Sequence, residues 1–395
     1  MRRNTRQNHR KNRKIYAIEE RERLKNWIIA KLSDLHELAK IINRQDSLAL
    51  DPRVDEFKAH PWTILKLQVL LSYNPVYTMI IGKRYPNMIY IDLFSGSGLS
   101  TYENSSVPIA GSPIISLITA IEPYTRVYLN DMNKRKINLL KKRINFLRKS
   151  GRVSNTSEIQ YFSDDANRTL NNILENLKLL KRWHALVFID PPGFEFKWES
   201  LEKLLKIKNR LDIILLFQSY SVAMQVLNHI RYGHSARKLN EFIGDSDWID
   251  YLNKKAESEG IKMQKLRRVD IENYMKDYYI SKIKKVLRNN NHQDVVIDIN
   301  IRLEGLMNAS YSILFISKYR GRYLEVIHAL KDKIEAAPKD FIKQVVSSFE
   351  SGHFAPGLTE YIIDYMKEID NLKISRRFKT IEKKTRLTLD DFMDY

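Results

Sequence analysis

Strand-like and helix-like segments alternate along the middle of this chain, and this alternation constrains the fold more than any other feature. Strand-like segments occur at residues 88–93, 126–129, 159–162, 185–189 and 213–217. Helix-like stretches separate the first four, at residues 112–122, 134–149 and 167–180. The runs at 185–189 and 213–217 are wholly apolar, which is typical of parallel strands buried on both faces. We therefore expect an α/β fold with a mostly parallel sheet, closed by a late pair of strands at residues 295–301 and 311–316.

The segments outside this series are helical or basic. We expect a basic tail and an N-terminal helical region over residues 1–60, and the α/β domain over residues 61–335. A helical insertion is predicted within that domain at about residues 223–292, and a C-terminal helical extension over residues 336–395. In this series Ser112 and Pro113 mark a helix start, because serine caps free N–H groups and proline suits the first helical position.

The charge of the chain points to an anionic partner. Lys and Arg number 67 against 47 Asp and Glu, which gives a net charge of +20. Nucleic acid is the partner that we expect, and an anionic membrane surface is the rival. No apolar run reaches the roughly 18–20 residues of a spanning helix, so we expect no membrane insertion. With no cysteine, the chain has no thiolate for zinc or iron–sulfur ligation; we predict no metal site and a cytoplasmic protein.

Basic residues cluster in four stretches. These stretches are residues 1–14, 134–152, 262–288 and 373–386. A single charge run is usually a solvated face, but several in one chain favour a track for a polyanion. Tyr274, Tyr278 and Tyr279 lie within one stretch, where they either stack on bases or belong to the core.

A glycine-rich turn follows the first strand of the series. Residues 92–98 read Asp-Leu-Phe-Ser-Gly-Ser-Gly, and glycines there let the backbone approach a ligand closely. Asp131 follows the second strand, where a carboxylate accepts hydrogen bonds from both ribose hydroxyls of a nucleoside. Asp164 and Asp165 follow the third strand, where such folds place an adenine contact. The alternatives are a simple tight turn for the glycines and helix N-caps for the three aspartates.

The turn favours S-adenosylmethionine over a nicotinamide dinucleotide. Thr101 stands where the dinucleotide fingerprint has its third glycine, and no helix begins before Ser112, so pyrophosphate finds no helix N-terminus. A sulfonium and an amino-acid tail instead suit an acidic strand end such as Asp92. The predicted cofactor residues are Asp92, Phe94, Ser95, Gly96, Gly98, Asp131, Asp164 and Asp165.

A second loop, Asp-Pro-Pro-Gly at residues 190–193, follows the fourth strand. It resembles the Asp/Asn/Ser-Pro-Pro-aromatic loop of methyltransferases that act on exocyclic amines of nucleic-acid bases. In such a loop a carboxylate and a backbone carbonyl accept the two amine N–H groups and raise electron density on nitrogen. The aromatic residue stacks on a flipped base; here it comes one place late. The predicted catalytic residues are Asp190, Pro191, Pro192 and Phe194. The alternative is a turn that merely ends a strand.

Taken together, the motifs resemble the three-Cys-motif partner (TcmP) family of methyltransferases. The resemblance covers roughly residues 60–335 and lies in residues 90–98, 111–113, 188–193, 239–244 with Trp248, and 311–315. The family usually has Asp-Pro-aromatic-Gly, so Pro192 is a departure. The resemblance implies a Rossmann-like class I methyltransferase sheet that binds S-adenosylmethionine, and a protein partner that carries a three-cysteine motif.

The function that the sequence predicts is S-adenosylmethionine-dependent methyl transfer, to an exocyclic nitrogen of a DNA or RNA base. The non-standard Asp-Pro-Pro-Gly keeps an alternative open, namely a nucleic-acid-binding partner subunit that has the methyltransferase fold without turnover. A protein methyltransferase is a third possibility.

Overall fold

The computed structural model describes residues 35, 37–55, 58–59, 61–102, 108–302 and 310–319, together with 324, 327, 328, 331 and 332. Residues 35 and 37–44 of the predicted N-terminal helical region are helical. The predictions for the basic tail at 1–14, the basic stretch at 373–386 and the extension at 336–395 lie outside the described residues. The predicted domain boundaries remain predictions.

A seven-stranded sheet forms the centre of the molecule, in the order β6-β5-β2-β7-β8-β10-β9. Its strands are β2 (Asn87–Asp92), β5 (Arg126–Asn130), β6 (Glu158–Phe162), β7 (Trp183–Ile189), β8 (Arg210–Phe217), β9 (Val295–Arg302) and β10 (Ser310–Ser317). The first five in sequence pair in parallel. β10 runs antiparallel between β8 and β9, with Ser312 opposite Phe217. The predicted Rossmann-like, mostly parallel sheet, with its closing pair of strands, is confirmed.

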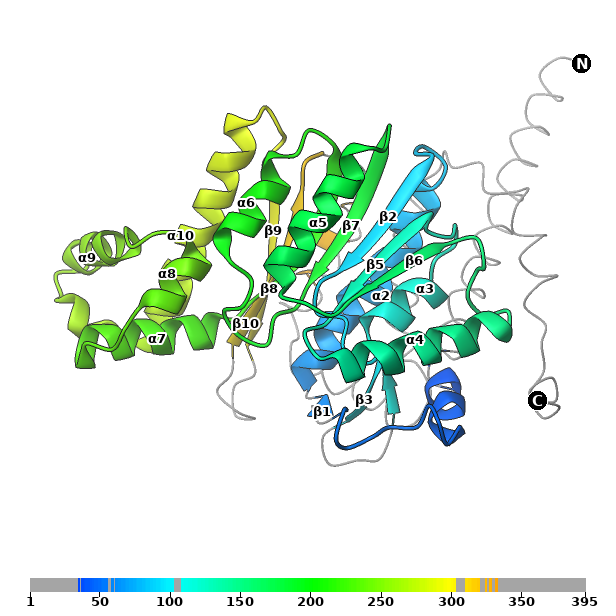
Figure 1. The fold of residues 1–395 in the computed structure, drawn as a ribbon. Coiled ribbons are helices and arrows are strands. Elements are labelled where there is room, and N and C mark those ends of the chain that lie inside the picture. Colours follow the sequence, from blue (N-terminus) through cyan, green and yellow to red (C-terminus); the bar gives the residue numbers. More distant parts are fainter. Residues whose placement is uncertain are drawn as a thin grey trace, which may run out of the picture.

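Helices cover both faces of the sheet (Figure 1). One face packs against α2 (Pro61–Ile81), α3 (Ser112–Ile118) and α4 (Lys134–Lys149). On the other side lie α5 (Ala166–Lys178), α6 (Trp198–Lys206), α7 (Ser219–Tyr232), α8 (Arg237–Ile243), α9 (Trp248–Ser258) and α10 (Arg268–Asn289), of which α8 packs on α6 and α9 on α10. The last four, with a short 3₁₀ turn at Met263–Lys265, form the helical insertion between β8 and β9.

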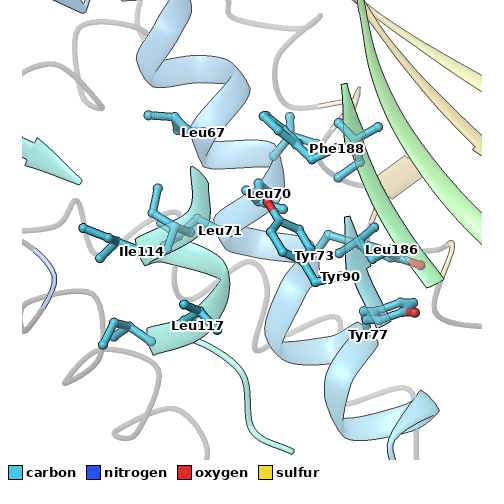
Figure 2. Close-up of a cluster of buried hydrophobic side chains, with 14 of the residues drawn as sticks. Leu67, Leu70, Leu71, Tyr73, Tyr77, Tyr90, Ile114, Leu117, Leu186 and Phe188 are labelled. Atoms are coloured by element: carbon cyan, nitrogen blue, oxygen red, sulfur yellow. The ribbon is translucent and has the colours of Figure 1, made fainter. Parts of the chain in front are cut away.

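Strand alternation explains the two cores. Met88 and Tyr90 of β2 face α2 and α3, whereas Ile89 and Ile91 face the opposite helices, because successive side chains point to opposite faces of a sheet. Both sets are buried, as the apolar runs predict. Figure 2 shows the first core, in which Tyr73 and Tyr77 of α2 lie beside the strands and α3 packs against the helix.

Polar contacts fix α2 at this face. The side-chain amide of Asn74 donates to Ser116 O at 2.9 Å and to Thr119 Oγ1 at 2.8 Å, which joins α2 to α3. The Tyr73 hydroxyl donates to Asp212 Oδ2 at 2.8 Å, which joins α2 to β8. Helix α2 is therefore held at both sides, and its first turns project toward the carboxyl ends of the strands.

Two local predictions are wrong. Helix α3 ends at Ile118, not near residue 122, and just beyond its end the Ile121 amide donates to Thr78 Oγ1 of α2 at 3.0 Å instead of to a carbonyl of the helix. Ser112 is the first helical residue rather than the cap; Gly111 occupies the cap position without a side-chain bond. The Ser112 hydroxyl instead donates to Asp92 Oδ2 at 2.6 Å, since a buried carboxylate is the stronger acceptor.

The segment between the glycine turn and α3, where the sequence predicts no helix, contains two strands. Strands β3 (Leu99–Tyr102) and β4 (Pro108–Ala110) pair antiparallel, and β1 (Lys58–Ala59) adds to β3 in parallel. This small sheet lies beside the carboxyl ends of the main strands (Figure 1). In the described part of the chain, no helix is long and apolar enough to cross a membrane.

Candidate functional site

A cleft of about 1270 Å³ opens at the carboxyl ends of the parallel strands. It is lined by every predicted site residue except Asp92: Phe94, Ser95, Gly96, Gly98, Asp131, Asp164, Asp165, Asp190, Pro191, Pro192 and Phe194. The loops after β2, β5 and β6 carry predicted cofactor residues, and we call this part of the cleft the cofactor half. The loop after β7 carries the predicted catalytic residues, in a part that we call the substrate half. The two sets of predicted residues therefore line the same cleft.

The two glycines of the turn have different structural roles. Both have positive φ, +60° at Gly96 and +86° at Gly98, which side-chain-bearing residues rarely adopt. A Cβ on Gly96 would meet nothing within 4 Å, whereas a Cβ on Gly98 would lie 2.7 Å from Leu140 Cδ1. Gly96 thus leaves open space in the cleft, and Gly98 lets the turn pack against α4.

Asp92 does not line the cleft, and its buried carboxylate holds the glycine turn through hydrogen bonds. It is fully buried and accepts hydrogen bonds from the Phe94 amide at 3.2 Å, the Ser112 hydroxyl at 2.6 Å and the Tyr90 hydroxyl at 3.1 Å. Burial raises its pKa to about 7, against the lowering effect of these bonds. Its carboxylate therefore ties the turn to α3. Unlike the other predicted cofactor residues, Asp92 does not line the cleft.

Asn130, which the sequence analysis missed, joins the ends of three strands. Its side-chain amide donates to Leu93 O at 3.0 Å and to Asp164 O at 3.1 Å. Its backbone carbonyl accepts from the Ser95 amide at 2.8 Å. This single buried residue holds the loops after β2 and β6 in register with β5. A polar residue at the end of an apolar strand was the available signal.

The aspartates after β5 and β6 are partly engaged. Asp131 Oδ1 accepts from the Asn133 amide at 2.8 Å, and Asn133, not Asp131, caps α4. No described residue bonds to the other oxygen of Asp131, which leaves it for a ligand. Asp165 caps α5 through the amides of Asn167 and Arg168, as the alternative interpretation of this residue held.

The side chain of Asp164 is 43% exposed. Its carboxylate takes a hydrogen bond from the Asp165 amide at 2.7 Å and an ion pair with Arg168 at 2.5 Å. The amide bond, with the arginine second, lowers the pKa of Asp164. The predicted adenine contact at these two residues therefore rests on groups that already have protein partners.

A buried ion pair between Arg143 and Asp55 lies next to the glycine turn of the cofactor half. Arg143 and Asp55 are 0% and 1% exposed, with Nη2 of the arginine 3.0 Å from Oδ2 of the aspartate. Arg143 also donates to Leu48 O and Ala49 O, both at 2.9 Å, and to Ser97 O at 3.0 Å. This cluster, which we call the arginine clamp, fastens residues 48–55 to the glycine turn. Its signal was a basic residue inside the apolar stripe of α4.

The substrate half contains two residues that the sequence analysis missed. Lys66, near the start of α2, forms an ion pair with Asp190, and both side chains are largely buried at 15% and 17% exposure. The Pro191 carbonyl accepts a hydrogen bond of 2.6 Å from Gln218 Nε2. Both groups predicted to hold an amine thus have a protein partner on one side and line the cleft on the other.

Phe194 lies between the cleft and an aromatic core. Its ring centroid is 5.2 Å from that of Phe242, which stacks on Tyr279 at 5.4 Å. Phe194 also lines the cleft, and a further part of the lining comes from the segment after β8 and from β10. Its polar residues are Gln218, Ser221, Gln225, Lys238, Glu241 and Tyr311.

The basic stretches differ in how much charge they leave exposed. In residues 262–288, five of the basic residues are in ion pairs: Arg267 with Asp270, Arg268 with Glu272, Lys276 with Asp298, Lys282 with Asp245, and Arg288 with Asp294. Tyr279 is fully buried, so it belongs to the core. On α4, by contrast, five exposed basic residues have no ion pair with any described residue: Lys134, Arg135, Lys141, Lys142 and Lys149.

Comparisons with known proteins give distant structural likenesses only. No protein-family model matches the chain, and no curated protein matches it. Protein LPL1258 from Legionella pneumophila is 14% identical over 75% of this chain and 92% of its own, with a TM-score of 0.36. Trm1 from Pyrococcus horikoshii, solved with S-adenosyl-L-methionine, is 16% identical over 65% of this chain and 57% of its own, with a TM-score of 0.34. At these scores neither likeness carries an argument about function.

Proposed function

We propose that this protein is an S-adenosylmethionine-dependent methyltransferase that acts on an exocyclic amine of a nucleic-acid base. One observation carries the proposal. The glycine turn after β2 and the Asp-Pro-Pro loop after β7 follow two adjacent parallel strands and line the same cleft. In open α/β sheets, ligands bind in the crevice outside the carboxyl ends of the strands.

The cofactor half suits a nucleoside without phosphates. The open space at Gly96 admits the ligand, and the available oxygen of Asp131 accepts a hydrogen bond from a ribose hydroxyl. No helix begins directly after the turn, because the β3–β4 hairpin intervenes before α3. When bound, S-adenosylmethionine supplies an electrophilic methyl group.

The substrate half suits a primary aromatic amine. The Asp190 carboxylate and the Pro191 carbonyl accept the two N–H groups of the amine, which raises electron density on its nitrogen. Lys66 and Gln218 hold these two acceptors from the protein side. Phe194 and Tyr311 line the same half and offer ring faces for the base.

The net charge of +20 and the unpaired basic residues of α4 support a nucleic acid as the substrate. The resemblance to the TcmP family adds a partner with a three-cysteine motif to the proposal, and the absence of cysteine adds a cytoplasmic location. The sequence is the only support for both.

The ion pair between Lys66 and Asp190 favours a second candidate, a nucleic-acid-binding subunit with the same fold and no turnover. In such a subunit Lys66 would stay paired with the Asp190 carboxylate, and no substrate amine would bind there. The two candidates share the cofactor half and differ only in the substrate half.

Calorimetric titration with S-adenosylhomocysteine tests the cofactor half. We expect binding by the native chain and weaker binding by Asp131→Ala, because each hydrogen bond lost to a charged acceptor costs roughly 1.5–3 kcal/mol. Asp250→Ala, on the exposed surface of α9, is the matched control. Absence of binding at millimolar S-adenosylhomocysteine would contradict the proposal.

Methyl transfer from labelled cofactor to DNA and RNA separates the two candidates. Asp190→Ala should keep its cofactor affinity and lose a factor on the order of 10² in turnover, as loss of a transition-state contact does. Cofactor binding without transfer to either nucleic acid would favour the inactive subunit. Loss of cofactor binding in Asp190→Ala, with none in Asp131→Ala, would reverse our assignment of the halves.

A further inference from the structure

A second cavity, of about 350 Å³, lies at the opposite edge of the main sheet. It is lined by Ile81, Arg84, Tyr85, Arg182, His184, Arg210 and Tyr319. These residues come from the end of α2, the starts of β7 and β8, and the end of β10. The amino ends of the strands are about 20 Å from their carboxyl ends for a strand of seven residues, so this cavity is separate from the cleft.

Three arginines converge on this cavity without a carboxylate to balance them. Arg84, Arg182 and Arg210 are exposed, and none forms an ion pair with a residue that the structure describes. No described lining residue is acidic. Arginines elsewhere on this surface, such as Arg168 and Arg267, do pair with carboxylates. Three guanidinium groups around one cavity create a positive field that suits a phosphate group.

The cavity also offers rings. The Arg210 guanidinium lies 4.3 Å from the centroid of the Tyr319 ring, and both side chains line the cavity. His184 is 2% exposed and shares a hydrogen bond of 3.0 Å between its Nδ1 and the Tyr77 hydroxyl. Tyr85 packs edge-on against His184, with centroids 5.2 Å apart. Burial lowers the pKa of His184 to about 3, so the imidazole is neutral and its ring adds no charge.

The backbone at Arg182 is in an unusual conformation. Its φ is +47°, which costs a residue with a side chain on the order of 1 kcal/mol or more. The left-handed conformation occurs directly before β7, where it helps set the position of Arg182 at the mouth of the cavity.

We propose that this cavity is a nucleotide-binding site in which Arg84, Arg182 and Arg210 hold a phosphate and the tyrosine rings contact the base. The volume is within the range of small-ligand pockets. The ligand is either a free nucleotide or one unit of a polynucleotide, since both present the same phosphate and ring. The site is independent of the proposed methyl transfer, because it shares no residue with the cleft.

Titration of the full chain with adenosine 5′-monophosphate, followed by calorimetry, tests the site. Arg84→Ala and Arg182→Ala should each weaken binding by about tenfold or more, as the loss of a charged hydrogen bond does. Lys254→Ala, at an exposed cation of α9 that lines neither the cleft nor this cavity, is the control and should leave the affinity unchanged. Thermal melting of each variant confirms that it folds.

The adenine and ribose of the probe also suit the cleft, so Asp131→Ala is titrated in parallel. Binding that Arg182→Ala loses and Asp131→Ala keeps supports the second cavity, whatever the outcome with S-adenosylhomocysteine. The reverse pattern, or no binding at millimolar nucleotide or oligonucleotide, overturns the proposal. Inorganic phosphate that binds as tightly as the nucleotide overturns the role of the rings.

A 5′-phosphorylated single-stranded oligonucleotide identifies the source of the ligand. Equal affinity for the mononucleotide and the oligonucleotide supports a free nucleotide. Affinity for the oligonucleotide that exceeds the mononucleotide by tenfold or more, and that falls in Arg182→Ala, supports a polynucleotide.

Discussion

The two halves of the cleft are built in different ways. In the cofactor half each loop is held by several short contacts from buried groups, such as those of Asn130, Asp92 and Arg143. In the substrate half, the hydrogen bonds and ion pairs that the described residues make with the two groups predicted to hold an amine come from Lys66 to Asp190 and from Gln218 to Pro191. The difference indicates a more rigid frame in the cofactor half than in the substrate half.

The origin of the residues differs in the same way. The cofactor half comes mainly from loops that directly follow β2, β5 and β6, so short stretches of sequence carry it. The substrate half combines α2, the loop after β7, the insertion helices and β10. Substrate preference is therefore expected to change with the insertion, while the cofactor frame stays the same.

Substitution of the arginine clamp should have the largest effect on stability. Arg143→Met leaves Asp55 as a buried charge without its partner, so we expect the free energy of unfolding to fall by about 3–5 kcal/mol. Denaturant unfolding measures it. Lys142→Met, at an exposed neighbour, should cost less than about 0.5 kcal/mol. A loss for Arg143→Met no larger than that of its neighbour would mean that the frame is not rigid.

The two glycines of the turn should separate stability from ligand binding. Gly98→Ala combines positive φ with a contact of 2.7 Å to Leu140, so we expect a loss of about 2–3 kcal/mol. Gly96→Ala has only the positive φ, at about 1 kcal/mol, but its methyl group projects into open space of the cleft. Unfolding and calorimetric titration together test the pair. Equal losses of stability, or unchanged cofactor affinity in Gly96→Ala, would contradict this division.

The buried Asp92 predicts a pH dependence of stability. Its pKa is about 7 in the folded chain and about 3.9 when unfolded, so the folded state binds the proton more tightly. The contribution of Asp92 to the free energy of unfolding is complete below pH 4, falls as the pH rises toward 7 and is lost above pH 7. The slope is at most about 1.4 kcal/mol per pH unit.

Asp92→Asn should therefore flatten the stability profile between pH 4 and 7. Asp212, whose pKa burial also raises to about 7, remains in this variant and keeps part of the slope. Chemical unfolding at several pH values measures both profiles. An unchanged slope in Asp92→Asn would show that the carboxylate does not titrate in this range.

The smallest effect on stability is expected in the substrate half. Lys66→Met removes a single, partly exposed partner of Asp190, so the free energy of unfolding should fall by only about 1 kcal/mol. Affinity for S-adenosylhomocysteine should not change, while turnover should fall by about tenfold if Lys66 positions the carboxylate. A stability loss as large as that of Arg143→Met would remove the contrast between the halves.

The sequence predicts local features of this molecule well. The bounds of α4 agree with the predicted residues 134–149, and the strands agree within a few residues, because apolar spacing and strand-ending polar residues are local signals. The glycine turn and the Asp-Pro-Pro loop reach one cleft because parallel strands bring their carboxyl ends to the same edge.

Contacts between distant segments could not be predicted. Arg143 and Asp55 are 88 positions apart, and the pair of Lys66 with Asp190 depends on how α2 packs across the sheet. The Ser112 hydroxyl looked like a helix cap because its local sequence favours one, but Asp92 lies close to it in space. The β3–β4 hairpin was missed because its strands are short and pair mainly with each other.

The arginine clamp also determines how far the chain can be shortened. A fragment that begins at Pro61 would keep every strand of the main sheet and would look complete from its topology. It would lack Asp55 and the carbonyls of residues 48 and 49, so that Arg143 would keep only Ser97 among these partners. A fragment that retains the arginine clamp must therefore begin upstream of Leu48, well before α2.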